Sequence, residues 1–79
     1  MPRVYLTKQE QLNSRLADWV AGEMKRRDMT HAKLAQERGI SQQAMSMKLR
    51  VERFSFEDLC FFVWYFQPDS ETLDMLLGI

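Results

Sequence analysis

The 79-residue chain has few of the residues on which metal binding, cross-linking and catalysis usually depend. Cys60 is its single cysteine and His31 its single histidine. One cysteine cannot form an internal disulfide, and such sparse use of cysteine is typical of proteins in a reducing compartment such as the cytoplasm. One histidine and one cysteine do not make a zinc site, and we find no Ser-His-Asp set and no glycine-rich phosphate loop. We therefore expect no enzyme activity, no metal and no cofactor.

Long apolar runs are also missing. The longest extends from Leu59 to Phe66, which is far shorter than the ~20 residues that a membrane-spanning helix needs. The first residues lack the apolar stretch of a secretion signal. With 46% hydrophobic and 28% charged residues, the composition predicts one small folded cytoplasmic domain over residues 1–79, in which Cys60 is a partly buried thiol.

Net charge is absent, because 11 basic and 11 acidic side chains cancel. Their distribution is uneven. Residues 1–24 sum to zero, residues 25–53 sum to +5 from eight basic and three acidic residues, and residues 54–79 sum to −5 from five acids and no base. A local basic segment attracts phosphate even in a neutral protein. The pattern favours an anionic partner for residues 25–53, although a solvated surface of uneven sign would look the same.

Apolar residues recur at helical spacing, and no segment shows the alternation of a strand. Thr7 to Glu10 has the form of a capping box, and Gln67-Pro68 interrupts the helical pattern near the end of the chain. The fold expected is all-α, a compact domain of five helices, with a loose arm at residues 1–6 and a C-terminal helix within 67–79. The expected helices cover about 8–27, the residues after Thr30 up to Gly39, and 42 to about 50. A fourth helix is capped by residues 55–58 and runs to about 66, and a last one opens at Asp69 or within 68–70 and runs to 77.

The helices have apolar stripes that should form one core. The first helix repeats an apolar residue every four positions, and the other helices add shorter stripes. The expected core residues are Leu12, Leu16, Val20, Met24, Leu34, Ala35, Met45, Leu49, Leu59, Phe62, Val63 and Phe66.

Residues 30–53 contain two short helical patterns around Gly39-Ile40-Ser41. Gly39 can adopt the left-handed backbone angles that end a helix sharply, and Ser41 can cap the next helix. The second helix then has a polar outer side and a basic end. Two helices with such a corner can place side chains in a DNA major groove.

The outward side of the second helix carries groups that suit DNA. A glutamine amide can bond to N6 and N7 of adenine together, and a methionine can lie on a thymine methyl. The residues expected to contact bases are Gln42, Gln43 and Met47. Those expected to contact phosphate are Thr30, His31, Ser41, Ser46, Lys48, Arg50 and Arg53. An exposed glutamine pair can also be ordinary surface, so the motif as a whole carries this hypothesis.

The same segment resembles the phage Cro- and repressor-type (XRE) helix-turn-helix family. The resemblance rests on Thr30, Leu34, Ala35, Gly39, Ile40, Ser41, Ser46, Leu49, Arg53, Phe56 and Leu59. It implies a lambda-repressor-like arrangement of five helices. It also implies a transcription regulator of phage or prophage type that binds a palindromic double-stranded DNA operator as a homodimer.

Three positions depart from the family pattern. His31 replaces a frequent glutamine, so the contact made there differs. Arg38 replaces an apolar residue before the turn, and we expect it either to face DNA or to loosen the packing. Val51 replaces a glycine that often needs positive φ, and a β-branched residue is strained in that conformation, so we expect the helix to extend or to end differently.

The last two helices carry more large apolar side chains than a chain of this length can bury. An exposed apolar patch usually marks an interface, and aromatic side chains dominate interface energetics. The expected interface residues are Phe61, Trp64, Tyr65, Met75, Leu76 and Ile79. A homodimer, a tightly wrapped monomer and a different protein partner all fit this pattern. The alternative function is a protein-interaction module, antitoxin-like or an antirepressor partner, that uses this surface.

Overall fold

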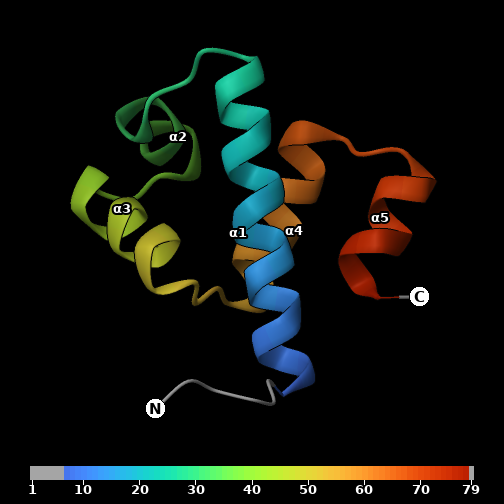
Figure 1. Cartoon of the computed structure of the whole chain (residues 1–79). Coiled ribbons are helices and arrows are strands. Elements are labelled where there is room, and N and C mark those ends of the chain that lie inside the picture. Colours follow the sequence, from blue (N-terminus) through green and yellow to red (C-terminus); the bar gives the residue numbers. More distant parts are fainter. Residues whose placement is uncertain (1–6, 79) are drawn as a thin grey trace.

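The computed structural model describes residues 7–78 and folds them into five α-helices without a strand among them (Figure 1). The helices are α1 (Lys8–Arg26), α2 (His31–Arg38), α3 (Gln42–Val51), α4 (Phe56–Phe66) and α5 (Ser70–Leu77). The all-α prediction is confirmed. The arm expected at residues 1–6 lies outside the described residues.

Every helix begins at a side chain that accepts a hydrogen bond from the backbone N–H three residues later. Such a cap satisfies one of the N–H groups that the first turn leaves without a partner. At Thr7 and Ser55 the carboxylate of the third helical residue bonds back to the cap, which completes a capping box. The capping residues are Thr7, Thr30, Ser41, Ser55 and Asp69.

The helix ends use left-handed backbone conformations. Gly39 (φ 82°) ends α2 and Gly78 (φ 77°) ends α5, as glycine does at low cost. At the end of α3, Val51 stays helical and the left-handed conformation falls on Glu52 (φ 56°). The helix therefore extends through Val51, because the unbranched Glu52 tolerates the left-handed conformation better than a β-branched valine.

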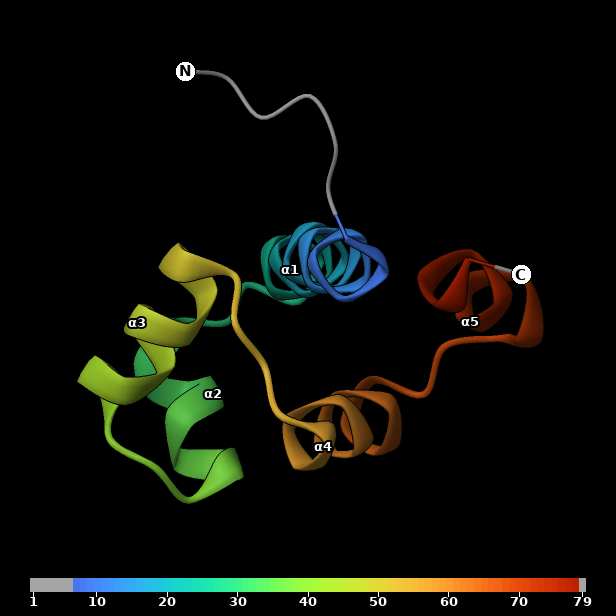
Figure 2. The same ribbon diagram turned by 90° about the horizontal axis from the view of Figure 1, so that it is seen from below.

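The core forms around α1, which lies in the middle of the molecule. Figure 2 looks along α1 and shows α2 and α3 on one side of it, α5 on the other and α4 between them. Trp19 and Phe66 meet edge to face with ring centroids 5.6 Å apart, a favourable geometry for aromatic pairs. The buried core residues are Leu16, Ala17, Val20, Met24, Leu34, Ala35, Met45, Phe62, Phe66 and Leu76.

Two arginines of the first helical segment attach the C-terminal half of the chain. The Nε of Arg15 donates to the carbonyl of Leu76 at 3.0 Å, and an Nη of Arg27 donates to the carbonyl of Phe66 at 3.2 Å. Both carbonyls lie at helix ends, where the chain itself supplies no partner. As a result α5 is packed on α1, and the side chain of Leu76 is fully buried.

Candidate nucleic-acid interface

Helices α2 and α3 meet at a three-residue corner and make the most extensive helix–helix contact in the described chain. The backbone N–H groups of Gly39 and Ile40 both donate to the carbonyl of Ala35, at 2.8 and 3.0 Å. The hydroxyl of Ser41 accepts from the N–H of Ala44 at 3.1 Å and starts α3. These local bonds fix the direction in which α3 leaves α2.

One side of α3 faces the core, and the opposite side faces solvent. Met45 is fully buried, so the residues on the far side of the helix are directed outward. Three of the residues proposed to contact DNA, Gln43, Met47 and Arg50, are exposed on this outer side, and Ser46 is half-buried at its edge. Gln42 is exposed too, in the first turn, but it is three residues before Met45 and therefore lies only about 60° from the centre of the buried side.

The outer side of α3 carries a shallow hollow lined by Gln43, Ser46, Met47 and Arg50. An Nη of Arg50 donates to the sulfur of Met47 at 3.1 Å, which keeps the guanidinium beside the apolar side chain. The hollow therefore combines amide donors and acceptors, an apolar surface and a positive charge. These are the groups that recognise base edges and phosphate.

The start of α2 lies beside this side of α3. The Nδ1 of His31 and the hydroxyl of Ser46 are 2.9 Å apart, so they form a hydrogen bond between the two helices. Thr30 is exposed, and its hydroxyl caps α2 by accepting from the N–H of Lys33 at 3.1 Å. His31 thus bridges α2 to α3. The proposed phosphate contacts of His31 and Ser46 compete with this bond.

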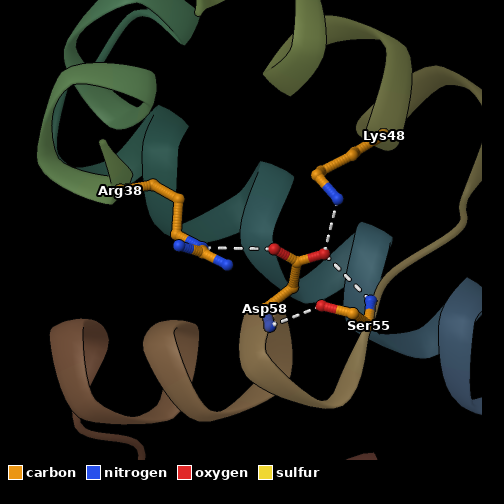
Figure 3. Close-up of polar contacts among 4 residues, drawn as sticks. All are labelled: Arg38, Lys48, Ser55 and Asp58. Carbon is orange, nitrogen blue, oxygen red and sulfur yellow. Dashed lines mark hydrogen bonds and ion pairs between the residues drawn. The ribbon is translucent and has the colours of Figure 1, made fainter. Parts of the chain in front are cut away.

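Lys48 does not lie with the other proposed phosphate contacts. Its Nζ donates to an Oδ of Asp58 at 2.8 Å (Figure 3). The reason is its position on the helix: three residues after Met45, it lies about 60° from the centre of the buried side. The assignment of Lys48 to phosphate binding is therefore replaced by an internal ion pair.

Arg38 is engaged by the same carboxylate. Its Nε donates to the other Oδ of Asp58 at 3.2 Å, and its guanidinium lies 5.9 Å from the ring centroid of Phe61. The expectation that Arg38 is exposed toward DNA was wrong, because its side chain is directed to α4. The fold accommodates the positive charge of Arg38 because α4 supplies both an acidic partner and an aromatic face.

Asp58 is the centre of this cluster and is fully buried (Figure 3). Its carboxylate also accepts from the N–H of Ser55 at 2.9 Å, while the hydroxyl of Ser55 accepts from the N–H of Asp58 at 3.1 Å. Burial by itself raises the pKa of this carboxyl, but the bonds from Lys48 and Ser55 and the charge of Lys48 outweigh it and hold the pKa below its ordinary value. One carboxylate thereby ties α4 to the ends of both α2 and α3.

Internal ion pairs occupy much of the basic block of residues 25–53. Arg26 and Arg27 pair with Glu23, Lys33 pairs with Glu37, and Asp58 takes Arg38 and Lys48. Within residues 7–78, this leaves three basic side chains of the block without an acidic partner, and they determine how strongly the block can attract phosphate. These three are Lys25, Arg50 and Arg53.

The second surface, on α4 and α5, is only partly as expected. Trp64 is 70% exposed and Met75 57% exposed, whereas Phe61 and Tyr65 are half-buried and stack on each other at 5.4 Å. Leu76 was wrongly assigned to the interface, because the contact of α5 with α1 buries it completely. The sixth expected residue, Ile79, lies outside the described residues.

Two residues of α4 are more exposed than the sequence suggested. Cys60 is exposed rather than partly buried. Phe56, which was not among the expected interface residues, is 78% exposed. The signal was in the spacing: Phe56, Cys60 and Trp64 are four residues apart and share one side of α4.

Comparisons of the chain with protein families, curated proteins and solved structures give no match. No helix among the described residues is both long and apolar enough to cross a bilayer. Within the same range, no three or more His, Cys, Asp or Glu side chains gather where a metal ion could bind.

Proposed function

We propose that this chain is a sequence-specific double-stranded DNA-binding transcription regulator of the helix-turn-helix type, related to phage or prophage repressors and Cro proteins. Helices α2 and α3 form the motif. The exposed side of α3 enters the major groove, with Gln42, Gln43 and Met47 at base edges. The protein acts as a homodimer on a palindromic operator and blocks polymerase by occupying it.

The observation that supports this proposal is the outer side of α3. It combines a glutamine amide, a thioether and an arginine, with a second exposed glutamine in the first turn, on a helix whose direction is fixed by the Gly39–Ser41 corner. Arg53 is exposed just beyond the end of the helix. A rigid helix whose exposed side chains are both polar and apolar can recognise base edges. Nearby arginines can position that helix on the phosphate backbone of DNA.

The proposal is tested by selecting bound duplexes from a random DNA pool with the full chain. We expect enrichment of a palindrome whose half-sites are about one helical turn apart. The same experiment reports site, symmetry and specificity together. A pool that shows no enriched motif after repeated selection at moderate salt contradicts the proposal.

Replacing Gln43 with alanine should weaken binding to the selected operator by about 1–3 kcal/mol and relax one base position. The amide would be lost while the helix remains, because Gln43 is exposed and supports no other group of the fold. The measurement is a titration of operator variants followed by anisotropy. Gln36→Ala on α2 is the matched control. Equal affinities of the Gln43→Ala variant and wild type on every sequence would exclude this residue from base contact.

Replacing Arg50 with alanine should weaken binding to all sequences alike and reduce the salt dependence. Each phosphate contact contributes about −0.9 to the slope of log K against log salt, so the slope should fall by about that amount. Lys8→Ala, which removes one exposed charge at the start of α1, serves as control. An unchanged slope in the Arg50→Ala variant would remove its phosphate role.

A second candidate is a protein-interaction module that uses the α4–α5 surface. The observation in its favour is that ion pairs within the chain neutralise five basic residues of the central block. The acidic end of the chain would then bind a basic protein. A mobility-shift assay on promoter DNA at moderate salt separates the two candidates, because only the first predicts a retarded band.

A further inference from the structure

The outer side of α4 carries an apolar stripe that consists of Phe56, Cys60 and Trp64. Phe56 is 78% exposed, Trp64 is 70% exposed and Cys60 between them is exposed. The three residues follow each other at four-residue spacing and extend over almost the full length of the helix. None of them is charged. A large aromatic side chain left in water at each end of one helix side marks a contact surface.

We infer that two copies of this chain pair along α4 in antiparallel orientation, with the two-fold axis at Cys60. The stripe matches itself when it is reversed, because Phe56 and Trp64 each lie about 6 Å along the axis from Cys60. In this pairing, Phe56 of each copy contacts Trp64 of the other, and the two Cys60 thiols face each other. A two-fold interface has this property: residue i meets j, and j meets i.

Charge favours the antiparallel over the parallel orientation. After α4 the chain carries three exposed acids and no base, at Asp69, Glu71 and Asp74. A parallel pair would bring the two acidic ends together. The antiparallel pair separates them and brings each toward the start of α4, where Arg53 is exposed beside the acids Glu52 and Glu57 and the charges nearly cancel. Opposed helix dipoles add to the preference.

The buried area sets the strength of the pairing. A fully buried aromatic residue covers about 150–250 Å², so four of them at the observed exposures cover roughly 450–750 Å². A stable interface buries at least about 1,200 Å². We therefore expect weak self-association in solution, strengthened when two copies occupy one operator. The inference rests on the proposed function only for this last step.

The first test is a covalent trap with the full-length protein in the absence of DNA. Diamide oxidises two thiols to one disulfide and takes up their two hydrogens. Wild type should form a Cys60–Cys60 dimer at least ~10-fold faster than a Cys60→Ser/Ala21→Cys variant, whose thiol lies on the exposed side of α1. Equal rates would show random collision and overturn the inference.

The second test determines orientation by charge exchange, measured by sedimentation equilibrium. Phe56→Glu and Trp64→Lys should each weaken dimerisation by ~30-fold or more, as loss of an interface anchor does. The double variant should recover dimerisation, because antiparallel pairing sets each glutamate against a lysine. In a parallel pair like charges would meet and no recovery would occur. Circular dichroism checks that these exposed positions leave the helices intact.

Neither test involves DNA, so the two proposals fail separately. A wild-type protein that stays monomeric at high concentration, or a double variant that stays monomeric, overturns the α4 pairing. A protein that pairs through α4 but enriches no DNA motif overturns only the proposed function. Recovery in the double variant together with fast Cys60 trapping supports the pairing.

Discussion

Asp58→Ala should destabilise the protein by about 3–5 kcal/mol, the usual cost of removing one partner of a buried ion pair. Asp58 is fully buried, and its loss leaves Arg38 and Lys48 without the carboxylate that they share. The bond from the N–H of Ser55 to this carboxylate, one half of the capping box of α4, is lost as well. A domain of this size has a total stability of roughly 4–12 kcal/mol, so we expect a partly or largely unfolded population, measured by urea denaturation.

The control for this prediction is Asp74→Ala, which removes one acid from an exposed position. It should change the free energy of unfolding by less than about 0.5 kcal/mol. If Asp58→Ala does not fold, Asp58→Asn gives the measurement, because the amide oxygen can still accept hydrogen bonds while the charge is gone. An Asp58→Asn variant as stable as wild type at pH 7 would argue against the ion-pair cluster.

The same carboxylate gives the stability a pH dependence. The folded pKa of Asp58 is lower than its ordinary value of 3.8, so the folded state binds fewer protons than the unfolded state as the pH falls. Its stabilisation is therefore complete above the ordinary pKa and is lost as the pH falls below about 4. At Asp69 the hydrogen bonds from Thr72 lower the pKa and act in the same direction. Asp58→Asn should flatten the acid limb of a stability–pH curve, while Asp74→Ala should not.

Met45→Ala should destabilise the protein by about 2–5 kcal/mol, whereas Met47→Ala, two residues along the same helix, should cost less than about 0.5 kcal/mol. Met45 is fully buried where α3 packs, and Met47 is 48% exposed on the outer side. The same substitution therefore leaves a cavity in the core at position 45 and only shortens an exposed side chain at position 47. Urea denaturation of both variants gives the two free energies.

The order of the two variants should be reversed for DNA affinity: Met47→Ala should have the larger effect and Met45→Ala the smaller one. Under conditions where both are folded, Met47→Ala should bind the operator more weakly, because the thioether contact to a thymine methyl is lost. Met45→Ala should bind with nearly wild-type affinity once the folded fraction is taken into account. Equal stability losses in the two variants would contradict the orientation of α3, and with it the proposed base contacts.

The helices and their ends are encoded locally, which is why the sequence predicts them well. Caps such as Thr7 and Ser55 depend on a side chain and an N–H three residues apart, and Gly39 adopts left-handed angles without help from its surroundings. The core stripe of α1 follows from the period of the helix alone. Even the displaced end of α3 follows from the strain that a β-branched Val51 would have.

Tertiary structure alone decided which charges are used inside the molecule. Lys48 and Arg38 are residue types that commonly bind phosphate. In the fold both contact Asp58 instead, because three helices bring together residues that are 10 and 20 positions apart in the chain. Contacts over such separations depend on packing, and a charge pattern in the sequence carries no information about them. The sequence predicted a basic block, and the fold determined that only part of it faces outward.

The same division holds for the apolar residues of the last two helices. Their excess over what the chain can bury was evident from the composition of residues 56–77. Which of them stay exposed depends on the contact of α5 with α1, which buries Leu76 and leaves Met75 in solvent, and on the rotation of α4, which leaves Phe56, Cys60 and Trp64 outside. The sequence by itself determined the elements and their amphipathic character. The packing of the elements decided which residues remain available to a partner, because burial is a property of neighbours and not of the residue.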